Sequence, residues 1–289
     1  MSVFELSLTL LAAVMHSAWN LLVHVRRQDA LLLVRLPLVF GLVGVLPIAM
    51  VEYLNPQMTS LAWRMLAVAV ICQAFYYLGL TMAYRAGDFS IVYPIARAVP
   101  IVMLAMVDQW RGRDPTWLGW LGVMLVTIGC LLLGVQAMRT TDGGVRPTLW
   151  IWIGVTSLAT FGYSVVDKIA LESMRTGLDT ALRYGVFELL FGALGASVCL
   201  GGWRWPRGKI KFPKSWAIVL CGAFLLGIGY VLILWVYQQA GQVSYVVAVR
   251  QVSVFVGVCV AAMLYERVGV VRIILAMIIA IGVAIVAIA

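Results

Sequence analysis

The sequence predicts an all-α membrane protein whose ten transmembrane helices form two inverted five-helix repeats. Three observations predict this fold: an apolar composition, about ten apolar runs of membrane-spanning length, and a similarity between the two halves of the chain. Of the 289 residues, 63% are hydrophobic and only 11% are charged, and the mean hydropathy is +1.01. Since a soluble domain has about 25% charged residues, a bilayer must replace water around most of this molecule.

The apolar runs are separated by short polar segments, and each run is long enough to cross a membrane. A bilayer core of about 30 Å and a helical rise of about 1.5 Å per residue require roughly 20 apolar residues per span. The predicted spans are 3–24, 31–52, 61–83, 89–109, 117–137, 148–168, 178–201, 216–238, 243–265 and 268–288. They leave no room for a separate soluble domain.

Short segments of the first half recur in the second half in the same order. Residues 86–90 read AGDFS and residues 240–244 read AGQVS, and Tyr76 corresponds to Tyr230 at the same offset. Weaker matches between the early spans pair Trp19-Asn20 with Tyr163-Ser164, and Arg35 with Arg183. This order along the chain indicates a duplication of a five-span unit.

A duplicated unit of five spans must be inverted, because an odd number of crossings makes the second copy enter from the opposite side. We therefore expect residues 1–138 and 147–289 to form two inverted repeats. Inverted repeats are a recurring transporter design in which substrate binds near the midplane, between the halves.

Four arginines lie inside or near the middle of predicted spans: Arg35, Arg97, Arg183 and Arg250. On insertion scales, each costs about 2.5–3.5 kcal/mol at the bilayer centre, so such residues usually face a cavity or a negative partner. The guanidinium fork suits a carboxylate, phosphate or phosphonate group. We expect these arginines to converge on a central substrate site; the alternative is that they pair internally or snorkel to the interface.

Further candidate residues have polar tips at similar depth in the spans. The candidates for substrate binding are Tyr76, Tyr93, Tyr230, Trp19, Asn20 and Gln251, and packing or interface-belt roles are the alternative for each. Glu188 and His16 are candidates for coupling transport to protons, although His16 also fits a hydrogen bond between helices. Asp108 and the pair Asp167-Lys168 lie near predicted span ends, where an interfacial position is expected.

Enzyme motifs and metal-ligand spacings are not found in the sequence. There is no phosphate loop, no HExxH and no Cys/His cluster with metal spacing, so we expect no enzymatic activity, no cofactor and no bound metal. The net charge of +9 comes from basic residues scattered at span ends. They indicate membrane topology, and a nucleic-acid partner is not expected.

Three segments of the chain resemble EamA-type proteins of the drug/metabolite transporter superfamily. They are AYRAGDFSIVYPIARAVPIVM at 83–103, AVRQVSVFVGVCVAAMLYERVGVVRIILAMIIAIGVAIV at 248–286, and HSAWNLL at 16–22. The resemblance covers essentially the whole chain. It implies ten helices in two inverted repeats, a central cavity, and export or uptake of amino acids, nucleosides, sugar phosphates or other metabolites. The arginine-bearing fourth and ninth spans resemble members associated with phosphonate use.

Together these observations favour a secondary transporter that moves a small anionic or zwitterionic metabolite by alternating access, with a coupled proton or a counter-substrate. Two alternatives stay open. A lipid flippase or scramblase that handles a phospholipid-like headgroup would use a similar cavity, and a non-transporting assembly partner would leave the arginines unexplained. We expect a multi-pass protein of a bacterial inner membrane, surrounded by lipid, as a monomer or homodimer.

The distribution of basic residues predicts the orientation of the chain. Connections after odd-numbered spans hold twelve lysines and arginines, and the remaining connections hold five. By the positive-inside rule, the odd connections are cytoplasmic and both termini lie outside, although members of the family are often drawn the other way round.

Overall fold

The computed structural model describes residues 1–25, 32–87, 89–139, 147–202, 216–263 and 269–289. Throughout these ranges the chain forms helices and short turns without a strand, which confirms the all-α prediction. The helices are α1 (Val3–Val25), α2 (Leu32–Leu54), α3 (Ser60–Ala86), α4 (Phe89–Trp110), α5 (Trp117–Arg139), α6 (Pro147–Glu172), α7 (Leu178–Gly202), α8 (Trp216–Gln239), α9 (Val243–Val249), α10 (Val252–Met263) and α11 (Val270–Ile288).

The predicted spans agree closely with these helices, with one difference. Each span except the ninth corresponds to one helix, whereas the ninth is divided into α9 and α10 at Arg250 and Gln251. In the described part of the chain, eight helices are long and apolar enough to cross a bilayer. The chain is therefore a multi-pass integral membrane protein, and the count of ten spans and the inverted repeat stay predictions.

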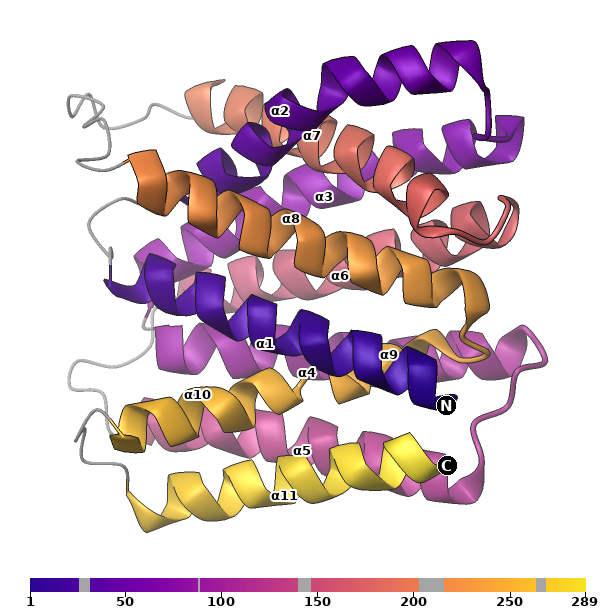
Figure 1. The fold of residues 1–289 in the computed structure, drawn as a ribbon. Helices are drawn as coiled ribbons and strands as arrows, with labels where there is room; N and C mark the ends of the chain where they lie inside the picture. The colour runs from indigo at the N-terminus through magenta and orange to yellow at the C-terminus, as the bar shows by residue number, and fades with distance from the viewer. Residues whose placement is uncertain (26–31, 88, 140–146, 203–215, 264–268) are drawn as a thin grey trace.

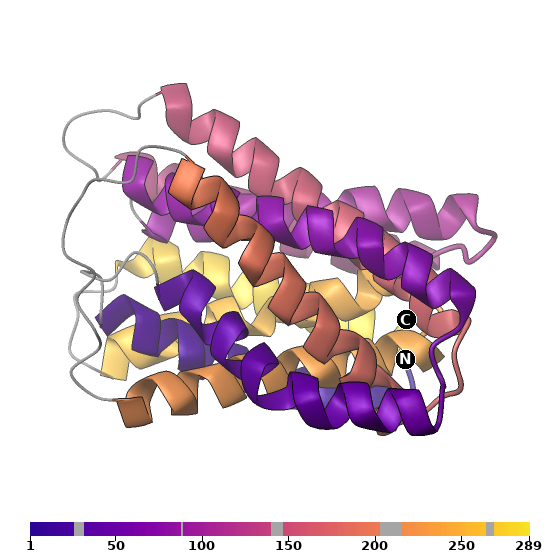
Figure 2. The same cartoon turned by 90° about the horizontal axis from the view of Figure 1, so that it is seen from above.

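The helices form a bundle in which those of the first half alternate with those of the second. In Figure 1, α2 and α7 lie at one edge and α5 and α11 at the other. Between them α3 packs against α6, α1 against α8, and α4 against α6 and α9. Both chain termini lie at the same end of the bundle, in Figure 1 and in the perpendicular view of Figure 2. We call this end the termini end.

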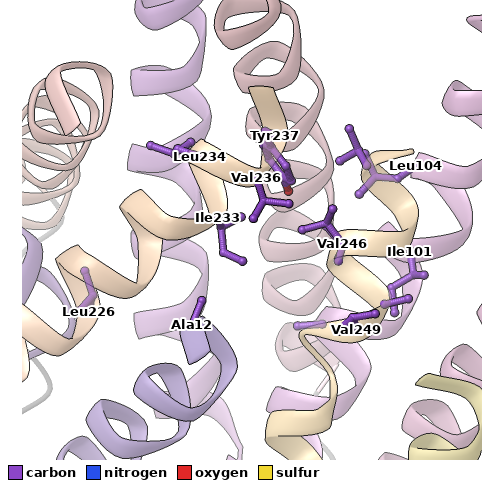
Figure 3. Packing of buried hydrophobic residues seen from close by; sticks show 14 of the residues in the cluster. Ala12, Ile101, Leu104, Leu226, Ile233, Leu234, Val236, Tyr237, Val246 and Val249 are labelled. Atoms are coloured by element: carbon purple, nitrogen blue, oxygen red, sulfur yellow. The ribbon is translucent and has the colours of Figure 1, made fainter. Parts of the chain in front are cut away.

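The core beside the broken span is formed by small and branched apolar side chains. Figure 3 shows Val246 and Val249 of α9 beside Ile101 and Leu104 of α4, with Tyr237 of α8 close by. All five side chains are buried. Because α9 has only seven residues, this packing, rather than its own length, must keep it helical.

Glycines bring α5 and α11 into close contact. A Cβ atom on Gly122 would lie 2.8 Å from the carbonyl oxygen of Gly282, and one on Gly282 would lie 3.0 Å from that of Gly122. Small residues at such positions let two membrane helices approach closely enough for backbone packing. On the outside of the bundle, large apolar side chains such as Leu46 and Val198 are more than three-quarters exposed, as expected for a surface in contact with lipid.

Candidate functional site

Two adjoining cavities lie between the halves of the chain. They contain about 510 and 420 Å³ of empty space, including the parts open to solvent. Their shared wall is formed by His16, Tyr76, Leu80, Tyr163 and Arg250. The first cavity extends toward α7 and α8, and the second toward α4. Side chains from both halves therefore surround one interior space.

Arg97 reaches the second cavity from the middle of α4. Two prolines flank it, Pro94 and Pro100, yet α4 continues as a helix through both. Proline at position 100 has no N–H for the carbonyl of Ala96, and Ser157 of α6 donates its hydroxyl to that carbonyl at 3.1 Å instead. Ser157, in the second half of the chain, thus supplies the hydrogen bond that the backbone beside Arg97 lacks. This bond holds this part of the cavity wall in place.

The guanidinium of Arg97 contacts an imidazole nitrogen and a phenol group. Its Nη1 atom contacts Nε2 of His16 and lies 3.2 Å from the hydroxyl of Tyr93, and its Cζ atom lies 5.1 Å from the centre of the Tyr93 ring. The ring contact is a cation–π interaction. Across the described residues, Arg97 forms no ion pair.

Arg250 occupies the break between α9 and α10. The backbone turns tightly here, because Gln251 N donates to Ala248 O and Ser253 N to Arg250 O. The side chain of Arg250 is 8% exposed, lines both cavities, and has a buried Nε atom without a hydrogen-bond partner among the residues that the structure describes. Irregular backbone at membrane depth is tolerated where it lines a cavity, so the break presents this arginine to the interior space.

His16 is surrounded by more hydrogen-bond donors than it can accept. Trp19 Nε1 lies 3.2 Å from its Nδ1 atom, and Arg97 Nη1 contacts its Nε2 atom. Indole and guanidinium groups only donate, and a neutral imidazole has one acceptor nitrogen. One ring nitrogen therefore faces a donor while carrying a hydrogen of its own, so this corner of the cavity has a surplus of N–H groups.

A row of aromatic rings connects the two cavities. The ring centroids of Tyr76 and Tyr163 are 5.7 Å apart, and those of Tyr163 and Tyr230 are 6.3 Å apart, both edge-on. Such edge-to-face pairs are favourable and stiffen the wall. Tyr76 and Tyr230, which correspond in the sequence, both line the first cavity.

The structure brings most of the predicted site residues together. The cavity walls include Arg97, Arg250, Tyr76, Tyr93, Tyr230, Trp19, Asn20 and His16. Asn20 donates its Nδ2 hydrogen to the carbonyl of His16 at 2.8 Å. Gln251 is fully buried but not on either wall; its Nε2 donates to the carbonyl of Val247 at 3.0 Å.

Two predicted arginines lie elsewhere. Arg183 is buried and paired with Glu52, with 2.6 Å between Nη1 and Oε2. This is the internal pairing that the sequence left open as an alternative. Arg35 of α2 is partly buried and is not on the wall of either cavity.

An acidic residue that sequence reasoning placed at the interface is in fact buried next to the cavity. Asp167 is fully buried, and its carboxylate is 2.8 Å from the hydroxyl of Tyr230, which also contacts Glu188 at 2.9 and 3.0 Å. The interfacial prediction for Asp167 was wrong because α6 continues to Glu172, beyond the expected end at residue 168. The spacing of four residues from Tyr163 was the overlooked signal, since such residues share a helix face.

Lys168 and Asp108 are buried as well, at the termini end. Lys168 donates to the carbonyls of Tyr237, at 2.6 Å, and Ala240. Asp108 accepts hydrogen bonds from the backbone N–H groups of Val243, at 3.2 Å, and Ser244, at 2.8 Å. Both residues thus bind the segment that joins α8 to α9. The expectation that they lie at the membrane interface was wrong, because both side chains are buried.

Comparison with known proteins agrees with the fold and the membrane character. Residues 3–135 match the EamA-like transporter family, which belongs to the drug/metabolite transporter superfamily. A solved structure titled only "Crystal structure of protein" is similar with a TM-score of 0.73 and 14% identity, over 99% of this chain and 96% of that chain. At this identity the likeness concerns the fold alone. The comparison with curated proteins finds no match.

Proposed function

Starting from the match of residues 3–135 to the EamA-like transporter family, we propose a secondary transporter for a small anionic or zwitterionic metabolite. The observation that carries the proposal is the pair Arg97 and Arg250, which line cavities between the halves and form no ion pair among the described residues. A buried cation without a counter-ion is unfavourable, so an anionic substrate would supply the missing partner.

The groups around the arginines favour an anion over a cation. The contacts of His16 with Trp19 and Arg97 leave a surplus of N–H donors on this side of the cavity. A carboxylate or phosphonate accepts several hydrogen bonds at once and can be held by a guanidinium fork. The tyrosine row would enclose the rest of a small solute, and with it an ammonium group if the substrate is zwitterionic.

Alternating access is supported by the symmetry of the helix contacts. We propose that residues 1–138 and 147–289 are inverted repeats, so that α1, α2, α3 and α5 correspond to α6, α7, α8 and α11. Under this exchange the contact of α3 with α6 becomes that of α8 with α1, and the contact of α3 with α7 becomes that of α8 with α2; both pairs exist. The same exchange turns α2 into α7 and α7 into α2, so it leaves the contact between these two helices unchanged.

Polar contacts join the two halves at the termini end. Glu172 of α6 pairs with Arg111 and Arg113 of the α4–α5 turn, and Arg183 of α7 pairs with Glu52 of α2. Nearby, the hydroxyls of Thr59 and Ser173 are 2.7 Å apart. In an alternating-access cycle these contacts hold this end shut and separate when the site opens toward it.

The test is ligand binding by purified protein, followed by thermal unfolding. Probes are methylphosphonate, inorganic phosphate and acetate, with tetramethylammonium as the cation control. Because a ligand stabilises the folded state to which it binds, a concentration of 100 times Kd adds about 2.7 kcal/mol. We expect at least one anion to raise the melting temperature and tetramethylammonium alone to leave it unchanged.

Substitution of the two arginines separates the proposal from general anion effects. Arg97→Ala and Arg250→Ala each remove charge-assisted hydrogen bonds worth about 1.5–3 kcal/mol, so affinity should fall roughly tenfold or more. Arg97→Lys keeps the charge but loses the fork, and should only partly restore binding. Arg64→Ala, at an exposed site on α3, is the matched control. Binding that survives both alanine variants contradicts the proposal; transbilayer movement of a fluorescent phospholipid without soluble-anion binding would support the lipid alternative.

We further propose a bacterial inner membrane as the location, a monomer or homodimer as the oligomeric state, and movement of the substrate with a proton or in exchange for a second solute.

A further inference from the structure

Two carboxyl groups share one phenol in the interior of the bundle. The hydroxyl of Tyr230 lies 2.8 Å from Asp167 Oδ2, 2.9 Å from Glu188 Oε1 and 3.0 Å from Glu188 Oε2. Tyr184 donates its hydroxyl to the other oxygen of Asp167 at 3.0 Å. Asp167 and Glu188 are both 0% exposed. Two acids therefore meet at one hydroxyl in a site closed to bulk water.

Counting hydrogens shows that this arrangement requires a proton. The hydroxyl of Tyr230 has one hydrogen, so it can donate to one of the two acids and must accept from the other, if both contacts are hydrogen bonds. An ionised carboxylate can only accept. Asp167 has a hydroxyl donor at each of its oxygens, Tyr184 and Tyr230, and such donors favour the ionised form of an acid; we therefore assign the negative charge to Asp167 and the proton to Glu188, which then donates to the oxygen of Tyr230. Like charges this close also disfavour ionisation of both groups.

The side chains around the pair offer hydroxyl and thiol groups. The titratable groups close enough to interact with Asp167 or Glu188 are Cys72 and Tyr77 of α3, Tyr184 of α7, and Tyr230 and Tyr237 of α8. Tyr163 of α6 lies against Tyr230. On α2, which also packs against α7 and α8, Glu52 is held by Arg183. In the described ranges, neither Asp167 nor Glu188 forms an ion pair.

Tyr230 connects the acid pair with the cavity. Tyr230 lines the first cavity together with Arg250, and its hydroxyl lies between the two acids. The wall that faces the solute and the hydrogen-bond network around the proton thus share one side chain. Loss of the proton would leave two adjacent buried anions and break one of the two bonds of Tyr230.

We propose that Asp167 and Glu188, bridged by Tyr230, form a proton-binding site that couples movement of the anion to a proton gradient. This inference rests on the proposed function for the coupling, whereas the proton site itself can be tested without any substrate. The shared proton stabilises the arrangement seen here, and its release disfavours it, so protonation biases the equilibrium between the two access states.

The first experiment detects the proton directly, by infrared spectroscopy of the purified protein over a range of pH. A protonated buried carboxylic acid has a carbonyl stretching band distinct from that of a carboxylate. We expect such a band to disappear as the pH rises and to be lost in Glu188→Gln. The band should persist in the control Asp179→Asn, which changes an exposed acid of α7. An unchanged band in Glu188→Gln overturns the proton site.

The second experiment tests coupling, with protein reconstituted into vesicles and methylphosphonate as the probe. Glu188→Gln has nearly the shape of the protonated acid, so melting temperature and exchange of the probe at equal pH should be retained, whereas accumulation driven by a pH gradient should be lost. Accumulation that persists in Glu188→Gln overturns the coupling. If the wild type neither exchanges nor accumulates methylphosphonate, the coupling and the proposed function both fail for this anion. The infrared experiment then still decides whether the proton site exists.

Discussion

Arg183 Nη1 lies 2.6 Å from Glu52 Oε2, in a buried ion pair that joins α7 to α2 across the two halves. The same nitrogen donates to the carbonyl of Asn55 at 2.7 Å, and the other oxygen of Glu52 accepts from the backbone N–H groups of Gln57 and Met58. One pair thus fixes both the contact between the halves and the turn from α2 to α3.

Removal of Arg183 should therefore destabilise the fold more than removal of an exposed arginine. Arg183→Ala leaves the carboxylate of Glu52 buried without its cation, which typically costs about 3–5 kcal/mol. Arg175→Ala is the control, because Arg175 and Asp179 form an exposed pair with side chains 67% and 46% exposed, worth about 0.2–1 kcal/mol. In thermal unfolding, the melting temperature should fall clearly for Arg183→Ala and hardly at all for Arg175→Ala. Equal melting temperatures of the two variants would contradict this role of the pair.

Gly227 of α8 should tolerate no side chain. A Cβ atom there would lie 2.3 Å from ring atoms of Phe40 on α2, and overpacking of this kind costs about 1–3 kcal/mol. We expect Gly227→Ala to lower the melting temperature and Phe40→Leu to restore part of the loss. At Gly154 of α6 no atom lies within 4 Å of the same position, so Gly154→Ala serves as the control. A stability unchanged by Gly227→Ala would show that α2 and α8 can move apart without cost.

Glu172 should control the opening of the termini end. Its carboxylate pairs with Lys168, Arg111 and Arg113, and Arg113 also donates to the carbonyl of Gly241 at 3.1 Å. Glu172→Gln removes the charge that holds the three cations together. We expect faster amide hydrogen exchange in residues 108–116 and 240–246, measured by mass spectrometry, because these segments lose their link.

The matched control for Glu172→Gln is Asp179→Asn, which also neutralises an acid but at an exposed pair. Exchange that accelerates equally in both variants, or in neither, would show that the Glu172 contacts do not hold this end together.

The orientation follows from the excess of basic residues on the connections after odd-numbered spans. A single cysteine introduced into the basic segment 203–214 should react with a membrane-impermeant maleimide only after the cytoplasmic face is exposed, for example in inverted vesicles. Reaction in intact cells would reverse the assignment and place both termini in the cytoplasm. Segment 203–214 lies outside the described residues, so this prediction rests on the charge count.

The membrane-spanning segments were predictable because they depend on local properties of the chain. Apolar length alone places the boundaries of α2, α5 and α8 within a few residues, since every backbone polar group in a bilayer must be bonded within its own helix. The division of α9 from α10 was not predicted. It depends on packing against α4 and on the cavity beside Arg250, neither of which is visible in a stretch of apolar letters.

The four arginines show that the site, like the fold, could be predicted from the sequence only in part. Their cost in a bilayer predicts that each needs a cavity or a partner, but not which of the two. Arg97 and Arg250 face the cavities, whereas Arg183 reaches Glu52, which is 131 residues away in the chain. Asp167 was misplaced for a related reason, because its distance from a helix end reveals nothing about the acid on the neighbouring helix.

The sequence by itself determined the membrane environment, the helices and the supply of costly polar groups, because these follow from composition and from the free energy of transfer into lipid. The tertiary structure alone decided which of those groups meet each other. It left Arg97 and Arg250 facing a cavity, paired Arg183 with Glu52, and brought Asp167 to Glu188 across Tyr230. Such partners come from helices far apart in the chain, and their distances are set by helix packing, which no local pattern encodes.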